Sequence, residues 1–167
     1  MKRILILFIL LTCFSFVKAQ NQIYSNNKEG VSFSYSNNFK KASIQSAKHM
    51  LLKLESGTTT IALSKWNYGI DESYTIWDED IVQLMKDNIN NSGTSVISFD
   101  KRYVNTKSGK KKALVAIIYS SSVNMHLLTY QFLHKGNLIQ VVVSNRGKYD
   151  KGMLATCDKY VSGLQIK

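Results

Sequence analysis

The sequence predicts a single α+β domain in which one large antiparallel β-sheet packs against helices. Several short runs of the 167-residue chain alternate apolar and polar residues, which is the pattern of strands with one buried face. Two other segments repeat their apolar residues with the period of a helix. The turns between the later strands are too short to hold crossover helices, which predicts antiparallel pairing. The predicted order of elements is therefore βββ-α-ββββ-α.

Three strands open the predicted domain. Residues 30–35 alternate apolar side chains with serines, which indicates a half-buried strand. Residues 49–55 form the second predicted strand, and residues 58–68 are β-branched at first and end in aromatics. Gly57 lies between these two runs, so we expect them to pair as a hairpin.

A helix follows, and its apolar residues lie at helical spacing. Thr75 is a suitable N-cap, and Asp78 three residues later would complete a weak capping box. Gly93 suits the C-terminal cap. We expect one buried face made of Trp77, Ile81, Leu84, Met85 and Ile89.

Four further strands and a closing helix complete the predicted order. Lysine-, serine- and glycine-rich turns separate the strands, which is typical of hairpins. The closing helix spans residues 149–162, and its apolar face carries Met153, Cys157, Tyr160 and Val161. The four strands are predicted at 95–104, 113–119, 127–133 and 138–143.

Residues 1–19 are typical of a secretory signal peptide. A basic start precedes an uncharged apolar run at 4–17, and small or aliphatic residues precede the expected cleavage point. This run is shorter than the roughly 20 residues that a membrane-spanning helix needs. We expect residues 20–167 to form one exported domain, either periplasmic or secreted. Lipid anchoring at Cys13 is a minority alternative, because the apolar run continues beyond that residue.

Residues 30–39 resemble the first strand of PsbP-like proteins, which often reads Gly, aliphatic, x, apolar, x, Tyr, Pro, x, x, aromatic. Ser36 stands where that pattern has proline. The later order of elements is similar too, so the resemblance covers most of residues 24–167. It implies an α-β-α sandwich and a place among binding or assembly modules, which include exported bacterial proteins of the DcrB type. The resemblance implies no shared catalytic centre and assigns no site residue.

Motifs for metal binding or covalent catalysis do not emerge from the sequence. None of His49, His126 and His134 lies three to five residues from another histidine or from a cysteine of the exported domain. His126 and His134 would share one strand face about 26 Å apart, too far to hold one ion. Cys157 lies on the apolar side of its helix, which favours a core thiol over a nucleophile. We expect no cofactor and favour a non-enzymatic role.

The acidic residues cluster within residues 71–80, which hold five of the 11 in the chain. Asp78, Glu79 and Asp80 fit the start of a helix, where the helix dipole favours negative charge. Asp71 and Glu72 fit an exposed loop. A hard-cation site, and with it a metal-assisted enzyme, is the least favoured alternative.

Lysine dominates the charge, which is formally +11 with a sequence pI of about 9.6. Four lysines surround one hairpin at residues 107–112. Such a patch could meet an acidic protein, anionic lipid or acidic glycan, or the lysines could simply guard strand edges. We expect no nucleic acid, because arginine is scarce and the domain is expected to be exported.

We therefore favour an exported binding or assembly module that acts through a protein–protein surface, with an unidentified envelope protein as partner. The alternative is an adaptor for a polyanion or membrane surface that uses the basic hairpin. Aromatic residues flank the acidic loop at 66–80 and could contact a partner. The candidate binding residues are Trp66, Tyr68, Asp71, Glu72, Tyr74, Lys107, Lys110, Lys111 and Lys112.

Overall fold

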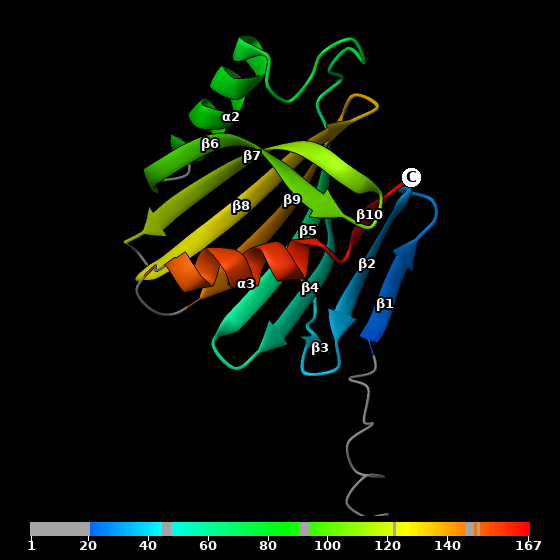
Figure 1. Ribbon diagram of the computed structural model, residues 1–167, viewed down its shortest axis with the longest axis vertical. Coiled ribbons are helices and arrows are strands. Elements are labelled where there is room, and N and C mark those ends of the chain that lie inside the picture. The colour runs from blue at the N-terminus through cyan, green and yellow to red at the C-terminus, as the bar shows by residue number, and fades with distance from the viewer. Residues whose placement is uncertain (1–20, 45–47, 91–93, 122, 146–148, 150) are drawn as a thin grey trace, which may run out of the picture.

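The computed structural model describes residues 21–44, 48–90, 94–121, 123–145, 149 and 151–167. These residues form a seven-stranded sheet, a three-stranded sheet and two helices (Figure 1). The expected signal peptide, Cys13 and Gly93 lie outside the described residues. Among the described residues, none of the helices has the length and apolar character needed to cross a bilayer.

The large sheet is antiparallel throughout, with the strand order β3-β4-β5-β9-β8-β7-β6. This arrangement confirms the predicted hairpin and the predicted four-stranded meander. The turn at Gly57 has a φ of 56°, a left-handed conformation that glycine adopts readily. The strands are β3 (Lys40–Lys41), β4 (Met50–Ser56), β5 (Thr59–Asn67), β6 (Ser95–Thr106), β7 (Gly109–Ser120), β8 (Met125–His134) and β9 (Asn137–Asn145).

The prediction of a single sheet was wrong for the first predicted strand. β2 (Val31–Ser36) lies between β1 (Asn21–Asn26) and β10 (Leu164–Ile166) in a separate small sheet. β1, β3 and β10 were not predicted. β3 and β10 are too short to carry a recognisable alternation, and β1 is mostly polar and exposed.

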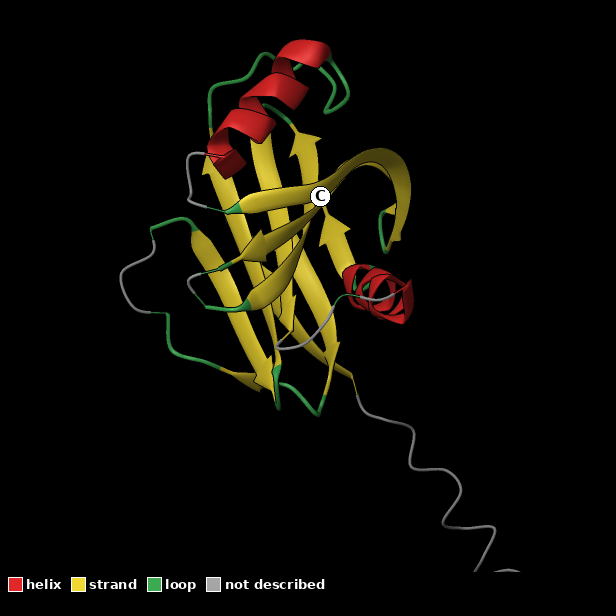
Figure 2. Ribbon diagram, turned by 90° about the vertical axis from the view of Figure 1, so that its left-hand side faces the viewer, coloured by secondary structure: helices red, strands yellow, loops and turns green. Residues whose placement is uncertain are grey.

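The two helices cover opposite faces of the large sheet. Along β9, Ile139 packs in the main core with α3 (Lys151–Val161), whereas its neighbour Leu138 packs with α2 (Glu79–Asn90). Figure 2 shows α2 at one end of the sheet and α3 lower down beside it. The predicted α+β class, with helices packed on a large antiparallel sheet, is confirmed.

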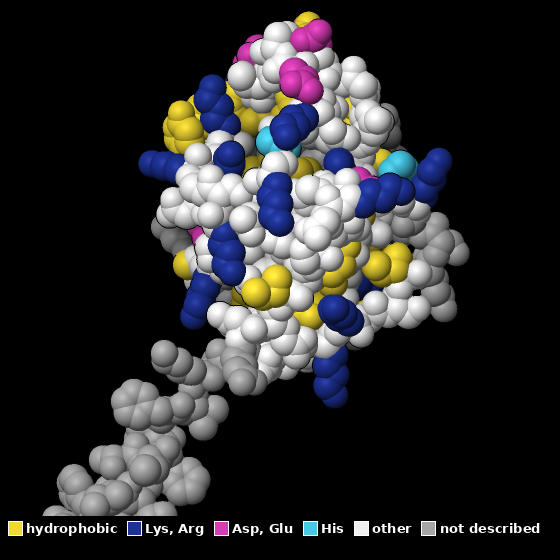
Figure 3. Space-filling model, turned by 90° about the vertical axis from the view of Figure 1, so that its right-hand side faces the viewer, with side chains coloured by type: hydrophobic (Ala, Val, Ile, Leu, Met, Phe, Trp, Pro, Cys, Tyr) yellow, Lys and Arg dark blue, Asp and Glu magenta, His cyan; other side chains and the backbone are white. Residues whose placement is uncertain are grey.

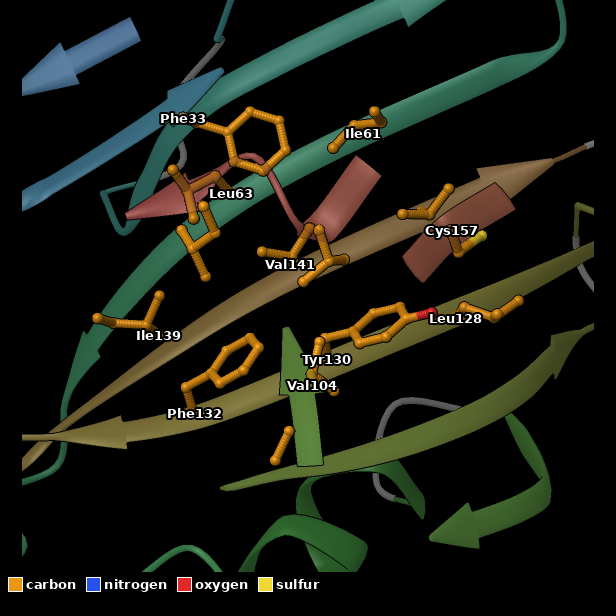
Figure 4. Close-up of a cluster of buried hydrophobic side chains, with 14 of the residues drawn as sticks. Phe33, Ile61, Leu63, Val104, Leu128, Tyr130, Phe132, Ile139, Val141 and Cys157 are labelled. Carbon is orange, nitrogen blue, oxygen red and sulfur yellow. The ribbon is translucent and has the colours of Figure 1, made fainter. Parts of the chain in front are cut away.

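The main core fills the space between the large sheet, α3 and the small sheet. Figure 4 shows Phe33 of β2 and Cys157 of α3 among side chains of the large sheet, including Leu63, Tyr130 and Val141. Cys157 is buried, as its place on the apolar helix face predicted. Burial of this continuous apolar set is what holds the two sheets together.

The start of α2 follows the predicted capping box. The Thr75 N–H donates to Asp78 Oδ2 at 2.6 Å, and Thr75 Oγ1 accepts from the Trp77 N–H at 3.4 Å. The predicted buried face was wrong at Leu84, which is 37% exposed, while Val82 is buried instead. Val82 lies nearer the centre of the face set by Ile81, Met85 and Ile89.

Candidate functional site

The basic hairpin separates from the large sheet near its tip. Pairing between β7 and β8 ends at Leu114–Gln131, but β6 and β7 remain paired to Thr106–Gly109. The hairpin therefore projects as a two-stranded ribbon beyond that point. Its tip is tied to the small sheet, because the Lys107 N–H donates to the Leu164 carbonyl at 2.8 Å.

Lys107 contacts the small sheet, whereas Lys110 and Lys112 lie beside aromatic rings on the hairpin. The Lys107 ammonium donates a hydrogen bond to Ser34 Oγ. The neighbouring Ser108 hydroxyl donates to the Ile166 carbonyl at 2.7 Å. Lys107 therefore belongs to the junction between the hairpin and the small sheet, apart from the aromatic residues described next.

Two aromatic rings and two lysines form a compact group on one face of the hairpin. The rings of Trp77 and Tyr103 pack edge to face, with centroids 4.9 Å apart. Lys112 Nζ lies 5.0 Å from the Trp77 centroid, and Lys110 Nζ lies 5.2 Å from the Tyr103 centroid. Both distances are within cation–π range. We call Trp77, Tyr103, Lys110 and Lys112 the aromatic–lysine patch.

The patch contains one residue that the sequence assigned to the core and one that it missed. Trp77 is half-buried, because its indole Nε1 donates to the Ala113 carbonyl at 3.0 Å and so holds the ring beside the hairpin. Tyr103 is 51% exposed. The feature that could have identified Tyr103 is the pairing of the hairpin strands, which places Tyr103 opposite Lys112.

A hollow of about 190 Å³ lies beside the patch, where β7 separates from β8. It brings together two surfaces that the sequence treated separately, the 66–80 loop and the basic hairpin. Tyr74 comes from the loop, and Lys111 and Lys112 come from the hairpin. Phe132 and Leu133 of β8 also line the hollow, and of the two only Leu133 is partly exposed.

Comparison with known proteins defines the fold. No protein-family model matches this chain, and no curated protein matches it. The solution structure of cyanobacterial PsbP (CyanoP) from Synechocystis sp. PCC 6803 is similar over 92% of this chain and 96% of that chain, with a TM-score of 0.64. The fold is PsbP-like. The identity is 16%, so this likeness establishes the fold alone.

A second similar structure is that of the Ran-binding protein Mog1p from Saccharomyces cerevisiae. It has a TM-score of 0.50 and 8% identity, and the match covers 89% of this chain and 96% of that chain. A mutant form of Mog1 matches with a TM-score of 0.52, 8% identity and coverage of 88% and 96%. The predicted PsbP-like architecture is thus confirmed, whereas the closer DcrB-type assignment stays a prediction.

In this PsbP-like fold, close packing positions the 66–80 loop. A Cβ added to Gly136 would lie 2.5 Å from the Ile70 carbonyl oxygen, so the β8–β9 turn contacts the loop directly. Asp71 Oδ1 accepts a hydrogen bond from the Ser73 N–H at 2.8 Å, which lowers the pKa of Asp71. Glu72 is exposed on the same turn. Both carboxylates are therefore explained by an exposed loop.

Trp66 and Tyr68 belong to a second aromatic group. The Trp66 ring stacks on His49 with centroids 4.2 Å apart, and on Tyr68 at 6.3 Å. Trp66 is half-buried and donates from Nε1 to Ser64 Oγ at 3.1 Å. Tyr68 is exposed, and its hydroxyl accepts from Asn88 at 3.5 Å.

Two acidic residues at the start of α2, Asp78 and Glu79, have structural partners. Asp78 accepts the capping hydrogen bond from Thr75, and Glu79 forms an ion pair with Lys101 of β6. The hydrogen bond from Lys101 lowers the pKa of Glu79. Across the part of the chain that the structure describes, no group of three or more metal-ligating side chains is found.

Cys157 and Tyr130 are buried groups of the PsbP-like core. Burial raises the pKa of the Cys157 thiol to about 12, so the thiol stays protonated at neutral pH. Burial and the nearby Asp158 raise the pKa of Tyr130. Asp158 accepts from the Tyr130 hydroxyl at 2.9 Å and from Arg102, which ties α3 to β8 and β6.

Charge is distributed unevenly over the surface. Figure 3 shows Lys and Arg side chains spread over the face that carries the small sheet, with acidic side chains gathered at the end near α2. Net positive charge of this kind attracts acidic partners and is sensitive to salt.

Proposed function

We propose that this chain is an exported, non-enzymatic binding or assembly module that acts through the aromatic–lysine patch. The observation that carries the proposal is the setting of Tyr103. Its ring is half exposed but is held against Trp77, and a lysine ammonium lies near each ring. A large aromatic side chain that is ordered before binding costs little entropy to immobilise at an interface.

The patch has the composition of an interaction hot spot. Tyrosine and tryptophan are enriched among residues that dominate binding energy, and charged groups around them set the approach of the partner. Lys110 and Lys112 would surround the aromatic centre with positive charge. The partner surface that fits is therefore acidic, with apolar groups at its centre.

The fold comparison supports a protein partner. Mog1p, which shares the fold, is described as a Ran-binding protein, so this architecture is compatible with binding another protein.

The proposal of export rests on the basic start and apolar run of residues 1–19. An unidentified protein of the cell envelope is accordingly the proposed partner.

A polyanion or membrane-surface adaptor is the second candidate. The observation in its favour is the run of three lysines on a projecting ribbon, Lys110, Lys111 and Lys112. Binding of that kind is dominated by charge, so it falls steeply as salt rises. A protein interface with an aromatic centre, in contrast, keeps most of its affinity as the salt concentration rises.

The test is affinity capture from a cell-envelope extract at low and high salt, with three versions of the protein. The wild type is compared with a Tyr103→Ala/Lys110→Glu variant and with Tyr68→Ala, an exposed aromatic outside the patch. We expect a defined protein to be retained at high salt by the wild type and by Tyr68→Ala, and lost from the patch variant. Retention of that protein by the patch variant would contradict the proposal.

Liposomes of anionic lipid, and heparin as a model acidic glycan, serve as the second arm. Binding to these probes at low salt alone, with no protein captured at high salt, would favour the adaptor. Circular dichroism of each variant checks that the fold is retained.

A further inference from the structure

The hollow lies where β7 leaves β8, so one edge of each strand has lost its neighbour in the large sheet. Beyond Leu114–Gln131, residues 109–113 of β7 and residues 132–134 of β8 are no longer paired with each other. The Ala113 carbonyl is satisfied instead by the Trp77 indole at 3.0 Å. The hollow therefore lies between two diverging strands, a setting that suits an extended peptide.

The hollow has apolar surface and a positively charged side. Tyr74 and Leu133 contribute the accessible apolar side chains, whereas Ile76, Phe132 and Ile166 line the hollow but are almost fully buried. Lys111 and Lys112 also line the hollow and supply positive charge. At about 190 Å³, the hollow has room for one apolar side chain of a partner.

A second hollow of about 210 Å³ shares the lining residue His134 with the first. The His134 ring Nε2 lies 2.9 Å from the Lys167 backbone oxygen, so this shared residue contacts the end of the small sheet. This second hollow is strongly basic. Its lining includes Lys28, Lys65, Lys135 and Lys167.

Positively charged side chains greatly outnumber negatively charged ones across the two hollows. Six lysines line them, against the single acidic side chain of Glu29. Glu29 is paired with Lys65, with Oε2 3.1 Å from Nζ. Lysines gathered around a concave surface focus the field and concentrate anionic groups there.

We infer that the two hollows bind an extended acidic segment of a partner protein, with an apolar side chain in the first hollow and carboxylates along the second. The inference rests on the proposed function, because it identifies the kind of protein segment that this surface takes. The apolar lining distinguishes a polypeptide from a simple polyanion. A phosphate-rich or sulfate-rich chain has no apolar group to place against Tyr74 and Leu133.

The probe for the test is a short fluorescent peptide in which glutamates flank a central Phe-Leu pair. Fluorescence anisotropy measures its affinity at physiological salt. We expect a Lys111→Glu/Lys135→Glu variant to lose about tenfold or more in affinity, which corresponds to about 1.4 kcal/mol. The matched control, Lys40→Glu/Lys159→Glu, changes the net charge equally on exposed lysines outside both hollows and should lose less than about threefold.

Two altered peptides separate the apolar and the charged contributions. Replacing Phe-Leu by Ser-Ser should weaken binding, and Tyr74→Ala should reduce the difference between the two peptides because Tyr74 lines the first hollow. Replacing the glutamates by glutamines should remove most of the affinity. Equal binding of the original and the Ser-Ser peptide, or equal losses in the two charge-reversal variants, would overturn the inference.

Failure of this inference can be told apart from failure of the proposed function. If the captured envelope protein is lost with Tyr103→Ala/Lys110→Glu but kept by Lys111→Glu/Lys135→Glu, the proposed function stands and the acidic-segment site is rejected. If heparin or anionic liposomes bind the two hollows as tightly as the peptide, a polyanion is the ligand and the inference is again rejected.

Discussion

Lys112 Nζ lies 5.0 Å from the centroid of Trp77, on a strand of the hairpin that Trp77 also holds through a hydrogen bond. The acceptor of that bond is the carbonyl of Ala113, the residue next to Lys112 and 36 positions from Trp77 in the sequence. One indole ring therefore connects the 66–80 loop to the basic hairpin.

Trp77→Phe should destabilise the protein by about 1 kcal/mol, because it keeps an aromatic ring but leaves the Ala113 carbonyl without its indole donor. Urea denaturation measures the change in the free energy of unfolding. Tyr103→Phe is the control, since it removes only an exposed hydroxyl from the same patch and should change stability by less than about 0.5 kcal/mol. Equal stability of Trp77→Phe and the wild type would show that the hydrogen bond contributes nothing.

Gly163→Ala should destabilise the protein by about 2 kcal/mol or more, because a Cβ at this position would lie 2.1 Å from the Ser34 carbonyl oxygen. β2 and the turn after α3 would then have to move apart. Gly57→Ala offers a matched comparison. Gly57 has a positive φ but nothing within 4 Å of an added Cβ, so only backbone strain of about 1 kcal/mol is expected. A larger loss of unfolding free energy in Gly57→Ala than in Gly163→Ala, measured by urea denaturation, would refute the steric argument.

Tyr130→Phe should cost about 1–2 kcal/mol, because the buried hydroxyl donates to Asp158 Oδ1 at 2.9 Å. The substitution keeps the ring and leaves the ion pair of Asp158 with Arg102 in place. Chemical denaturation provides the measurement, with Tyr68→Phe as the exposed control. A change no larger than that of the control would mean that the hydroxyl adds no stability.

Stability should fall as pH rises above the ordinary thiol pKa of 9.0, because burial raises the pKa of Cys157 in the folded state to about 12. In this range the unfolded chain releases the thiol proton and the folded chain keeps it, so alkali favours unfolding. Cys157→Ala should show a shallower decline of unfolding free energy from about pH 8 to about pH 10. The cavity that the substitution creates lowers the unfolding free energy at every pH, so comparing the slopes of unfolding free energy against pH isolates the contribution of the thiol.

The same burial predicts slow chemistry at Cys157. A thiol reagent should label the native protein slowly at neutral pH and rapidly once urea unfolds it. Fast labelling of the native protein would contradict the assignment of this cysteine to the core.

Much of the fold could be predicted because burial leaves a local pattern. The alternation at residues 30–35, the helical spacing from Ile81 to Ile89 and the short turns of the four-stranded meander each depend on neighbours in sequence. The structure confirms these elements with small shifts at their ends. The capping box of Thr75 and Asp78 is equally local, and it too is present.

The candidate binding residues were predicted less well than the fold, because the structure divides them among three separate places. Tyr74, Lys111 and Lys112 meet in one hollow, whereas Trp66 and Tyr68 join His49 in another group and Lys107 contacts the small sheet. Tyr103 was not among the candidates, because an exposed tyrosine in a strand has no distinguishing local pattern. Its position became meaningful only beside Trp77.

The sequence by itself determined both helices, seven of the strands and most of the buried face of each, because those properties follow from the spacing of apolar residues along a short stretch. Only the tertiary structure decided that β2 pairs with β1 and β10, that β7 leaves β8 at Leu114, and that the loop meets the hairpin. These relationships join segments far apart in the chain. They depend on the shapes of packed surfaces, as at Gly163 and Gly136, where only the absence of a side chain permits the contact.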